Sequence, residues 1–353
     1  MSEHLIPWWR IDLGDSEAES VRQAINARCI NQGKLCREFE ERVEARLNVG
    51  HAVTCANGSA ALFLALLSCG VEPGDEVIVP AVTYIATAHA VKLAGARVRL
   101  VDVQEDRPLL DPVAVGRAIT PLTRAIIAVH LNGCACDING LRRYGLPVIE
   151  DAAQAFCSRG PDGWLGTLGD AGAYSMSIAK IMTTGEGGFM VSNNRNTAGA
   201  ARCLRNQGVE VIADNVFDRF GFNFRLTDIQ AAIGLAQFAQ LPRKIEAVRN
   251  VYRFYREAVP GLHILPVDLD GGELPLWTQG VSSNRDFLIS RLGEQGIQVR
   301  PFNPCLADSP QLEATGDFPN ARRFAEQVFT LPSGPDQSGE DLEKVARALR
   351  EVV

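Results

Sequence analysis

The chain has 353 residues, of which 46% are hydrophobic and 22% are charged. This length and apolar content allow a full hydrophobic core and, at ~150 residues per domain, predict two domains. The formal net charge of −7 argues against non-specific nucleic-acid binding, because proteins of that class need a basic surface.

The sequence predicts a cytoplasmic protein without a membrane segment. Met1–His4 has neither the basic nor the apolar part of a signal peptide, and no run approaches the ~20 apolar residues of a membrane span. The nine cysteines are odd in number and scattered, which indicates reduced thiols and no disulfide framework. Cys134 and Cys136 lack a second ligand pair at metal spacing, so we expect no metal site.

In chain order, a first helix is expected to begin at the capping box Ser16–Glu19. From residue 38 onward, continuous apolar runs of strand length alternate with helical periods. Such alternation is typical of an α/β fold with a mostly parallel sheet that helices cover on both faces. The predicted strands are 51–55, 76–80, 97–103, 124–129, 146–149, 171–177 and 188–192, and the helices between them include 39–47, 59–69 and 84–93.

The pattern changes after Asp228. A long helical stretch runs from there to about Glu257 with an interruption at Pro242, and a smaller α+β segment follows. We therefore expect a large domain of residues 1–242, with an N-terminal helical segment, and a small C-terminal domain of residues 243–353. Helices of the small domain are expected near 284–294, 319–329 and 339–351.

Polar side chains and glycines follow several predicted strands at the edge where ligands bind in open α/β sheets. Asn57–Ala60 opens a helix, where free N–H groups suit a phosphate, although an ordinary helix cap would look the same. Asp151 follows the strand 146–149. A carboxylate there can keep a pyridine nitrogen protonated, or it can simply cap the next helix.

Lys180 lies in an apolar turn that leads into the glycine-rich segment ending at Gly188. Loss of solvation there would lower the pKa of its ammonium group and make the amine a nucleophile and proton carrier. An exposed loop lysine is the alternative. The segment Gly221–Asp228 is, from its residues alone, a polar loop and helix cap.

From about residue 6 to the C-terminus, the chain resembles the sugar aminotransferases of the DegT/DnrJ/EryC1/StrS type. These belong to the pyridoxal-phosphate (PLP) dependent enzymes of fold type I. The resemblance rests on ordered motifs at consistent spacing. They are Asn57–Leu62, Val79–Thr87, Val129–Gly133, Val148–Gln154, Lys180–Gly188 and Gly221–Asp228, the last followed by Gln230–Gly234.

The resemblance implies an aspartate-aminotransferase-like fold, PLP as cofactor and a homodimer. Lys180 matches the lysine that forms the Schiff base with PLP, and Asp151 matches the carboxylate on the pyridine nitrogen. His130 is interpreted as a structural or substrate-positioning group, and Arg225 matches a basic residue for an anionic substrate group. The other implied cofactor-binding residues are Gln154 near the phenolic oxygen, Tyr84 stacked on the ring, Gly58, Ser59 and Ser175 around the phosphate, and Asn223, which reaches the phosphate from the partner subunit.

The implied reaction transfers an amino group from L-glutamate or L-glutamine to a keto-sugar linked to a nucleotide; a keto-cyclitol acceptor stays open. Sugar dehydratases of the family replace the Schiff-base lysine by histidine, so Lys180 argues against that activity. A non-catalytic PLP-binding regulator would need an added binding segment, which the sequence lacks. A nicotinamide dehydrogenase is disfavoured because no G-x-G-x-x-G follows the first strand. Three segments depart from the family pattern and leave the acceptor open: Ser177–Ala179, Leu276–Ser283 and Arg300–Pro304.

Overall fold

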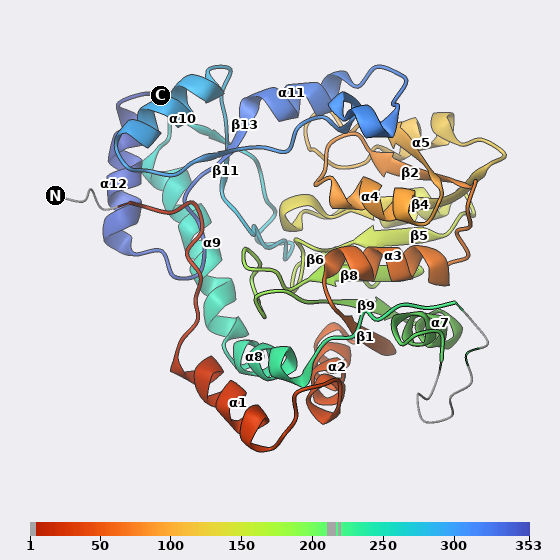
Figure 1. Ribbon diagram of the computed structural model, residues 1–353. Coiled ribbons are helices and arrows are strands. Elements are labelled where there is room, and N and C mark those ends of the chain that lie inside the picture. Colours follow the sequence, from red (N-terminus) through yellow and green to blue (C-terminus); the bar gives the residue numbers. More distant parts are fainter. Residues whose placement is uncertain (1–4, 210–216, 218–219) are drawn as a thin grey trace.

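A seven-stranded sheet forms the centre of the large domain in the computed structural model, which describes residues 5–209, 217 and 220–353 (Figure 1). The strand order is β1-β9-β8-β5-β4-β2-β3, and only β9 runs antiparallel to its neighbours. A two-stranded ribbon, β6-β7, lies outside this sheet. The strands are β1 (His51–Cys55), β2 (Glu76–Pro80), β3 (Arg97–Val101), β4 (Thr123–Val129), β5 (Val148–Asp151), β6 (Arg159–Gly160), β7 (Gly163–Trp164), β8 (Ala171–Ser175) and β9 (Gly188–Ser192).

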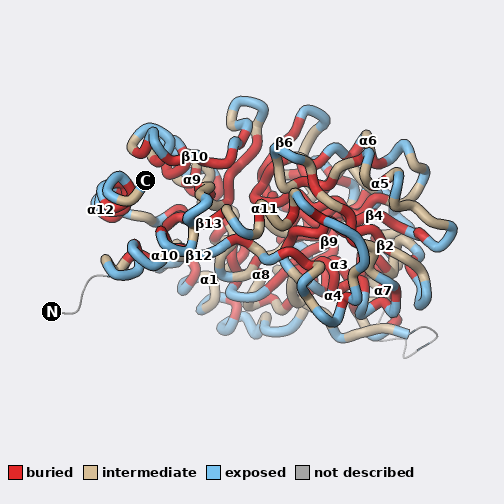
Figure 2. The backbone as a smooth tube through the Cα atoms, turned by 90° about the horizontal axis from the view of Figure 1, so that it is seen from above, coloured by how far each residue is buried: buried red, intermediate tan, exposed pale blue. Residues whose placement is uncertain are grey.

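Helices cover both faces of this sheet, which explains why its strands read as continuous apolar runs. Val77 and Val79 of β2 join the core under α3 and α4, whereas Ile78 between them joins the core under α5 and α6. Figure 2 shows the buried backbone concentrated in the sheet and the exposed backbone in the surrounding turns and helices. The helices of this part are α1 (Asp15–Asn26), α2 (Lys34–Leu47), α3 (Gly58–Ser68), α4 (Ala86–Leu93), α5 (Pro112–Ala118), α6 (Ile138–Arg142) and α7 (Arg195–Arg205).

A four-stranded antiparallel sheet of order β10-β11-β13-β12 forms the centre of the smaller C-terminal part. The helix α9 leads from the large part into it (Figure 1). Short 3₁₀ turns occur at 131–133, 306–308 and 310–312. The elements are α8 (Asp228–Ala239), α9 (Leu241–Ala258), β10 (His263–Ile264), β11 (Gln279–Val281), α10 (Arg285–Glu294), β12 (Arg300–Pro301), α11 (Pro319–Gln327), β13 (Val328–Thr330) and α12 (Gly339–Arg350).

The N-terminal arm, residues 5–14 before α1, lies against the small part, although the sequence assigned it to the large domain. Ile6 forms a backbone bridge with Ile297, and Trp9 forms one with Ser333. We propose that the domain boundary lies near residue 243, at the start of α9, and that the arm connects the two domains.

Several predicted boundaries were wrong by a few residues: α2 begins at Lys34 and not at residue 39, β5 runs from Val148 to Asp151 and not over 146–149, and β8 ends at Ser175 and not at residue 177. The helix α1 begins at Asp15, and the carboxylate of Glu17, not that of Glu19, accepts the N–H of Gly14 at 2.9 Å. The break between α8 and α9 falls at Gln240 and not at Pro242, because proline is tolerated in the first turn of a helix. Residues 1–4, on which the expected absence of a signal peptide rests, lie outside the described residues. Among those described, no helix combines the length and apolar character of a membrane span.

Candidate active site

The turns that follow β1, β5 and β8 meet at one edge of the central sheet. Asp151 is the last residue of β5 and pairs with Ala173 of β8. Ser175 ends β8 and lies opposite Gly188, which in turn lies opposite Cys55 at the end of β1. The strand order thus brings together features that are far apart in the sequence.

The turn after β1 presents free backbone N–H groups at the start of α3. The side chain of Asn57 caps this helix by accepting the N–H of Ala60 at 2.8 Å. The N–H groups of Gly58 and Ser59 have no acceptor within the described part of the chain. A Cβ on Gly58 would lie 2.7 Å from the Cβ of Ser175, so only glycine allows this close approach. Free N–H groups at a helix N-terminus suit an anion, and we call this turn the anion site.

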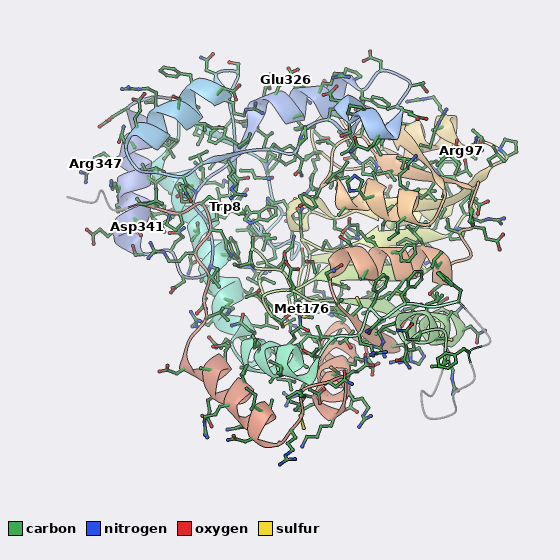
Figure 3. The ribbon with its side chains drawn as sticks, viewed as in Figure 1. Trp8, Arg97, Met176, Glu326, Asp341 and Arg347 are labelled. Atoms are coloured by element: carbon green, nitrogen blue, oxygen red, sulfur yellow. The ribbon has the colours of Figure 1, made fainter. Side chains whose placement is uncertain are left out.

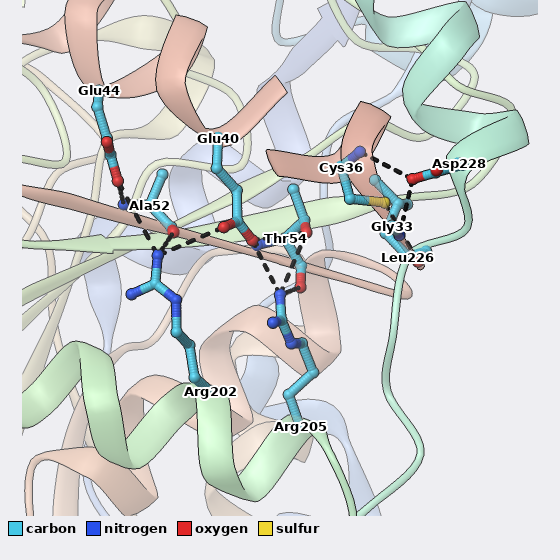
Figure 4. Close-up of polar contacts among 10 residues, drawn as sticks. All are labelled: Gly33, Cys36, Glu40, Glu44, Ala52, Thr54, Arg202, Arg205, Leu226 and Asp228. Carbon is cyan, nitrogen blue, oxygen red and sulfur yellow. Dashed lines mark hydrogen bonds and ion pairs between the residues drawn. The ribbon is translucent and has the colours of Figure 1, made fainter. Parts of the chain in front are cut away.

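A buried network holds β1 in place beneath this turn (Figure 4). The carboxylate of Glu40 accepts the N–H and the hydroxyl of Thr54, each at 2.8 Å, and pairs with Arg205 at 2.9 Å. Arg205 also donates to the Thr54 carbonyl at 2.7 Å. Nearby, Asp228 at the start of α8 accepts the N–H of Cys36 at 2.9 Å. These contacts tie α2, α7 and α8 to the strand that leads into the anion site.

Asp151 is 6% exposed and is hydrogen-bonded on both oxygens. Its Oδ2 accepts the hydroxyl of Thr87 at 2.7 Å, and its Oδ1 accepts the N–H of Ala153 at 3.1 Å. Burial raises the pKa of this carboxyl group, and the Thr87 hydrogen bond opposes that change.

Lys180 lines a small cavity together with Gln154 and Ser175. Its Nζ lies 5.4 Å from the ring centre of Trp277. Burial lowers the pKa of its ammonium group to about 8, against a smaller opposite effect of the Asp151 charge. Compared with an ordinary lysine, much more of the amine is therefore in the neutral form that a nucleophile requires, although the ammonium form still predominates at physiological pH.

Asn132 sets the orientation of Gln154. The N–H of Asn132 donates to Gln154 Oε1 at 2.7 Å, which leaves the amide NH₂ of Gln154 as the donor available to a ligand. The Asn132 side chain also exchanges two hydrogen bonds with the backbone of Trp277, at 2.9 and 2.8 Å. Its φ of 54° lies in the left-handed region that asparagine tolerates better than most residues.

The remaining predicted residues are Tyr84, Ser59 and Asn223 for the cofactor and Arg225 for the substrate. Tyr84 lies between β2 and α4 and is 62% exposed. Ser59 and Asn223 are exposed, and the side chain of Arg225 donates to Asn206 at 3.0 Å. The carbonyl of Phe224 accepts the N–H of Ala56 at 2.8 Å, so this segment passes beside the anion site of its own subunit.

His130 is fully buried, and protein atoms contact both of its ring nitrogens. Its Nδ1 accepts the N–H of Cys136 at 3.1 Å, so its Nε2 carries the proton and donates to Glu150 at 2.7 Å. Glu150 also accepts three backbone N–H groups of the segment 166–169. Of the two roles that the sequence allowed for His130, this geometry favours the structural one and argues against a direct substrate contact.

The three segments that depart from the family pattern converge on the N-terminal arm. Trp9 Nε1 donates to the carbonyl of Ile178 at 3.0 Å. The Trp8 ring lies 6.0 Å from that of Trp277 and stacks against the Arg300 guanidinium at 4.3 Å. In Figure 3 the Trp8 side chain extends from the arm toward the middle of the molecule. We call Trp8, Trp277 and Arg300 the aromatic wall.

These residues fit PLP. The anion site suits its phosphate, the buried carboxylate suits its ring nitrogen, and the amine of Lys180 suits its aldehyde. The buried indole N–H of Trp277 has no partner among the described residues, as expected beside a ligand site. In that part of the chain, no group of three His, Cys, Asp or Glu side chains could hold a metal ion.

Sequence reasoning missed three residues of this arrangement: Thr87, Asn132 and Trp277. Thr87 and Asn132 lie inside motifs that carried the resemblance, and their place in those motifs was the signal that could have identified them. No sequence feature indicated Trp277, because this residue contacts Asn132 from 145 positions away along the chain.

Comparisons with known proteins agree with this geometry. A model of the DegT/DnrJ/EryC1/StrS aminotransferase family matches residues 12–350. GDP-perosamine synthase of Caulobacter vibrioides is 36% identical, over 97% of this chain and 96% of that protein. The solved structure of the aminotransferase TlmJ from Streptoalloteichus hindustanus has a TM-score of 0.93 at 28% identity and covers 98% of both chains. S. venezuelae DesV has a TM-score of 0.89 at 32% identity, over 97% of this chain and 98% of that one. The predicted fold class, family and cofactor are thereby confirmed, and the chain belongs to the DegT/DnrJ/EryC1/StrS family of PLP-dependent aminotransferases.

Proposed function

We propose that this aminotransferase moves an amino group from L-glutamate or L-glutamine to a keto-sugar linked to a nucleotide, for amino-sugar biosynthesis. The observation that carries the proposal is Lys180, whose pKa burial lowers, whose charge interacts with that of Asp151 and whose Nζ lies 5.4 Å from the ring centre of Trp277. The full-length similarity to a GDP-perosamine synthase supports a nucleotide-sugar acceptor. A keto-cyclitol is the second candidate acceptor.

In this proposal each residue has one task. When bound, PLP supplies an aldehyde that takes up the amino group and a cationic ring that accepts electrons. Gly58, Ser59 and Ser175 would hold its phosphate, while Tyr84 would cover the ring. Asp151 would keep the ring nitrogen protonated, and the NH₂ group of Gln154 would donate to the phenolic oxygen.

Lys180 Nζ carries the proton. As a neutral amine it takes the proton from the α-carbon of the amino donor, and in the second half-reaction it returns a proton to the carbon that bears the new amino group. One site serves both halves, so ping-pong kinetics are expected. The aromatic wall borders the acceptor, and we assign Arg225 to an anionic group of the substrate.

We further propose a homodimer in the cytoplasm. Asn223 would reach the phosphate in the partner's site, which its exposed position allows. Phe220, 78% exposed, offers apolar surface beside it. No disulfide joins the cysteines among the described residues, which supports a reducing compartment.

A panel of acceptors tests the substrate. The protein is first converted to its amino form with L-glutamate and then mixed with nucleotide-linked keto-sugars, keto-cyclitols or 2-oxo acids. We expect amination of a nucleotide-linked keto-sugar, detected by mass spectrometry, and none with Lys180→Ala. Efficient transfer between two amino acids with no transfer to any keto-sugar or cyclitol would disprove the proposal.

A further inference from the structure

We propose that Thr87 is a positioning residue for Asp151, which it holds ionised and oriented toward the ring nitrogen of PLP. The inference rests on the role given to Asp151 in the proposed function. Thr87 lies in the first turn of α4, and its hydroxyl lies 2.7 Å from Asp151 Oδ2.

The direction of this hydrogen bond follows from the charge on Asp151. An ionised carboxylate can only accept, so the Thr87 hydroxyl must donate. Thr83 Oγ1 lies 3.3 Å from Thr87 Oγ1 and can then donate to it in turn. Thr83, Thr87 and Asp151 thus form a chain of hydrogen bonds that all point toward the carboxylate.

Burial makes this chain consequential. Thr87 is 0% and Thr83 is 1% exposed, and Asp151 is 6% exposed, so water cannot replace a lost hydroxyl. Burial favours the neutral acid, in which Asp151 would be a donor. A neutral Asp151 could not stabilise a protonated ring nitrogen. The Thr87 hydroxyl and the Ala153 N–H are the hydrogen-bond donors found on this carboxylate within the described residues, and together they favour its ionised form.

The test compares binding of PLP with binding of its 1-deaza analogue, in which C–H replaces the ring nitrogen. Equilibrium dialysis of the cofactor-free protein gives both Kd values. Thr87→Val removes the donor but keeps the shape. Because hydrogen bonds to charged groups are strong, we expect it to weaken PLP binding roughly tenfold and to leave the Kd of the analogue within about twofold.

Matched variants separate this role from a structural one. Thr87→Ser keeps the hydroxyl and should bind both ligands like the unchanged protein. Thr83→Val should weaken PLP binding selectively but less. Thr330, in β13 of the small sheet, is also buried, with 6% of its surface exposed. Thr330→Val should therefore change neither Kd. If Thr87→Val does not fold, as judged by circular dichroism, the comparison of Thr83→Val with Thr330→Val carries the test.

Asp151→Asn provides the reference and distinguishes the two levels of failure. It should abolish the preference for PLP over the analogue. If Asp151→Asn does so and the threonine variants do not, or if Thr87→Val weakens both ligands alike, the inference about Thr87 is wrong and the role of Asp151 stands. If Asp151→Asn leaves the preference unchanged, the assignment of Asp151 fails, and the inference fails with it.

Discussion

Burial changes Asp151 and Lys180 in opposite directions for the same reason. Low polarity disfavours the charged form of either group, so the pKa of the acid rises and the pKa of the amine falls. Their mutual attraction partly opposes both changes. At this site, a lysine whose neutral form is more accessible than usual lies near a carboxyl group whose hydrogen bonds favour its ionised form, and both conditions suit the proposed chemistry.

The pKa of Lys180 predicts how fast it captures PLP at different pH values. Below its pKa of about 8 the amine is mostly protonated and unreactive, and above it the amine is mostly neutral. The rate of covalent capture should therefore rise with pH, reach half its maximum near pH 8 and then level off. A lysine of ordinary pKa would keep gaining rate beyond about pH 10. Stopped-flow absorbance of cofactor-free protein mixed with PLP measures this profile.

Two controls accompany that profile. The same measurement with a simple primary amine in solution corrects for the ionisation of PLP itself. Borohydride trapping and peptide mapping should place the pyridoxyl group on Lys180 and find none there in Lys180→Ala. A trapped adduct on another lysine, or a midpoint above pH 10, would contradict the assignment.

At the scale of elements, the sequence predicted what depends on local pattern. The apolar runs located the strands, and the polar residues after them located Asn57, Asp151 and Lys180 at one edge, because parallel strands end together. It could not predict which side chains complete the site from elsewhere. Thr87 meets Asp151 through the packing of α4 on the sheet, and Trp277 arrives from the small domain.

The start of α3 offers a test at this scale. A Cβ on Gly58 would clash with Ser175 at 2.7 Å, so Gly58→Ala should displace the helix N-terminus from the phosphate. We expect it to weaken PLP binding on the order of tenfold or more, and to affect pyridoxal, which has no phosphate, far less. Equilibrium dialysis measures both. Gly199→Ala in α7 is the matched control, because its Cβ would meet nothing within 4 Å. Equal losses for both ligands in Gly58→Ala would mean that the turn does not bind phosphate.

At the scale of the whole molecule, the N-terminal arm connects the two domains to the site. It pairs with Ile297 and Ser333 of the small domain, and Trp9 holds the carbonyl of Ile178, two positions before Lys180. The residues of the aromatic wall therefore come from opposite ends of the chain. Periodicity in the sequence carries no information about such contacts, which is why it could not identify the particular sugar.

The proposed homodimer makes the last prediction, which concerns whether each site is built from two chains. The segment containing Asn223 passes beside its own anion site through the contact of Phe224 with Ala56, so the side chain could serve either subunit.

A complementation experiment distinguishes these two arrangements. Lys180→Ala should be inactive alone, and Asn223→Asp should bind PLP poorly, because its carboxylate would repel the phosphate. In a mixed dimer with shared sites, one site carries both changes and the other carries neither. A statistical mixture of the two inactive proteins should then recover about a quarter of the normal activity at limiting PLP, since half of the dimers are mixed and each has one intact site. Mixed dimers verified by differential tags that recover no activity would place Asn223 in its own subunit's site or in none.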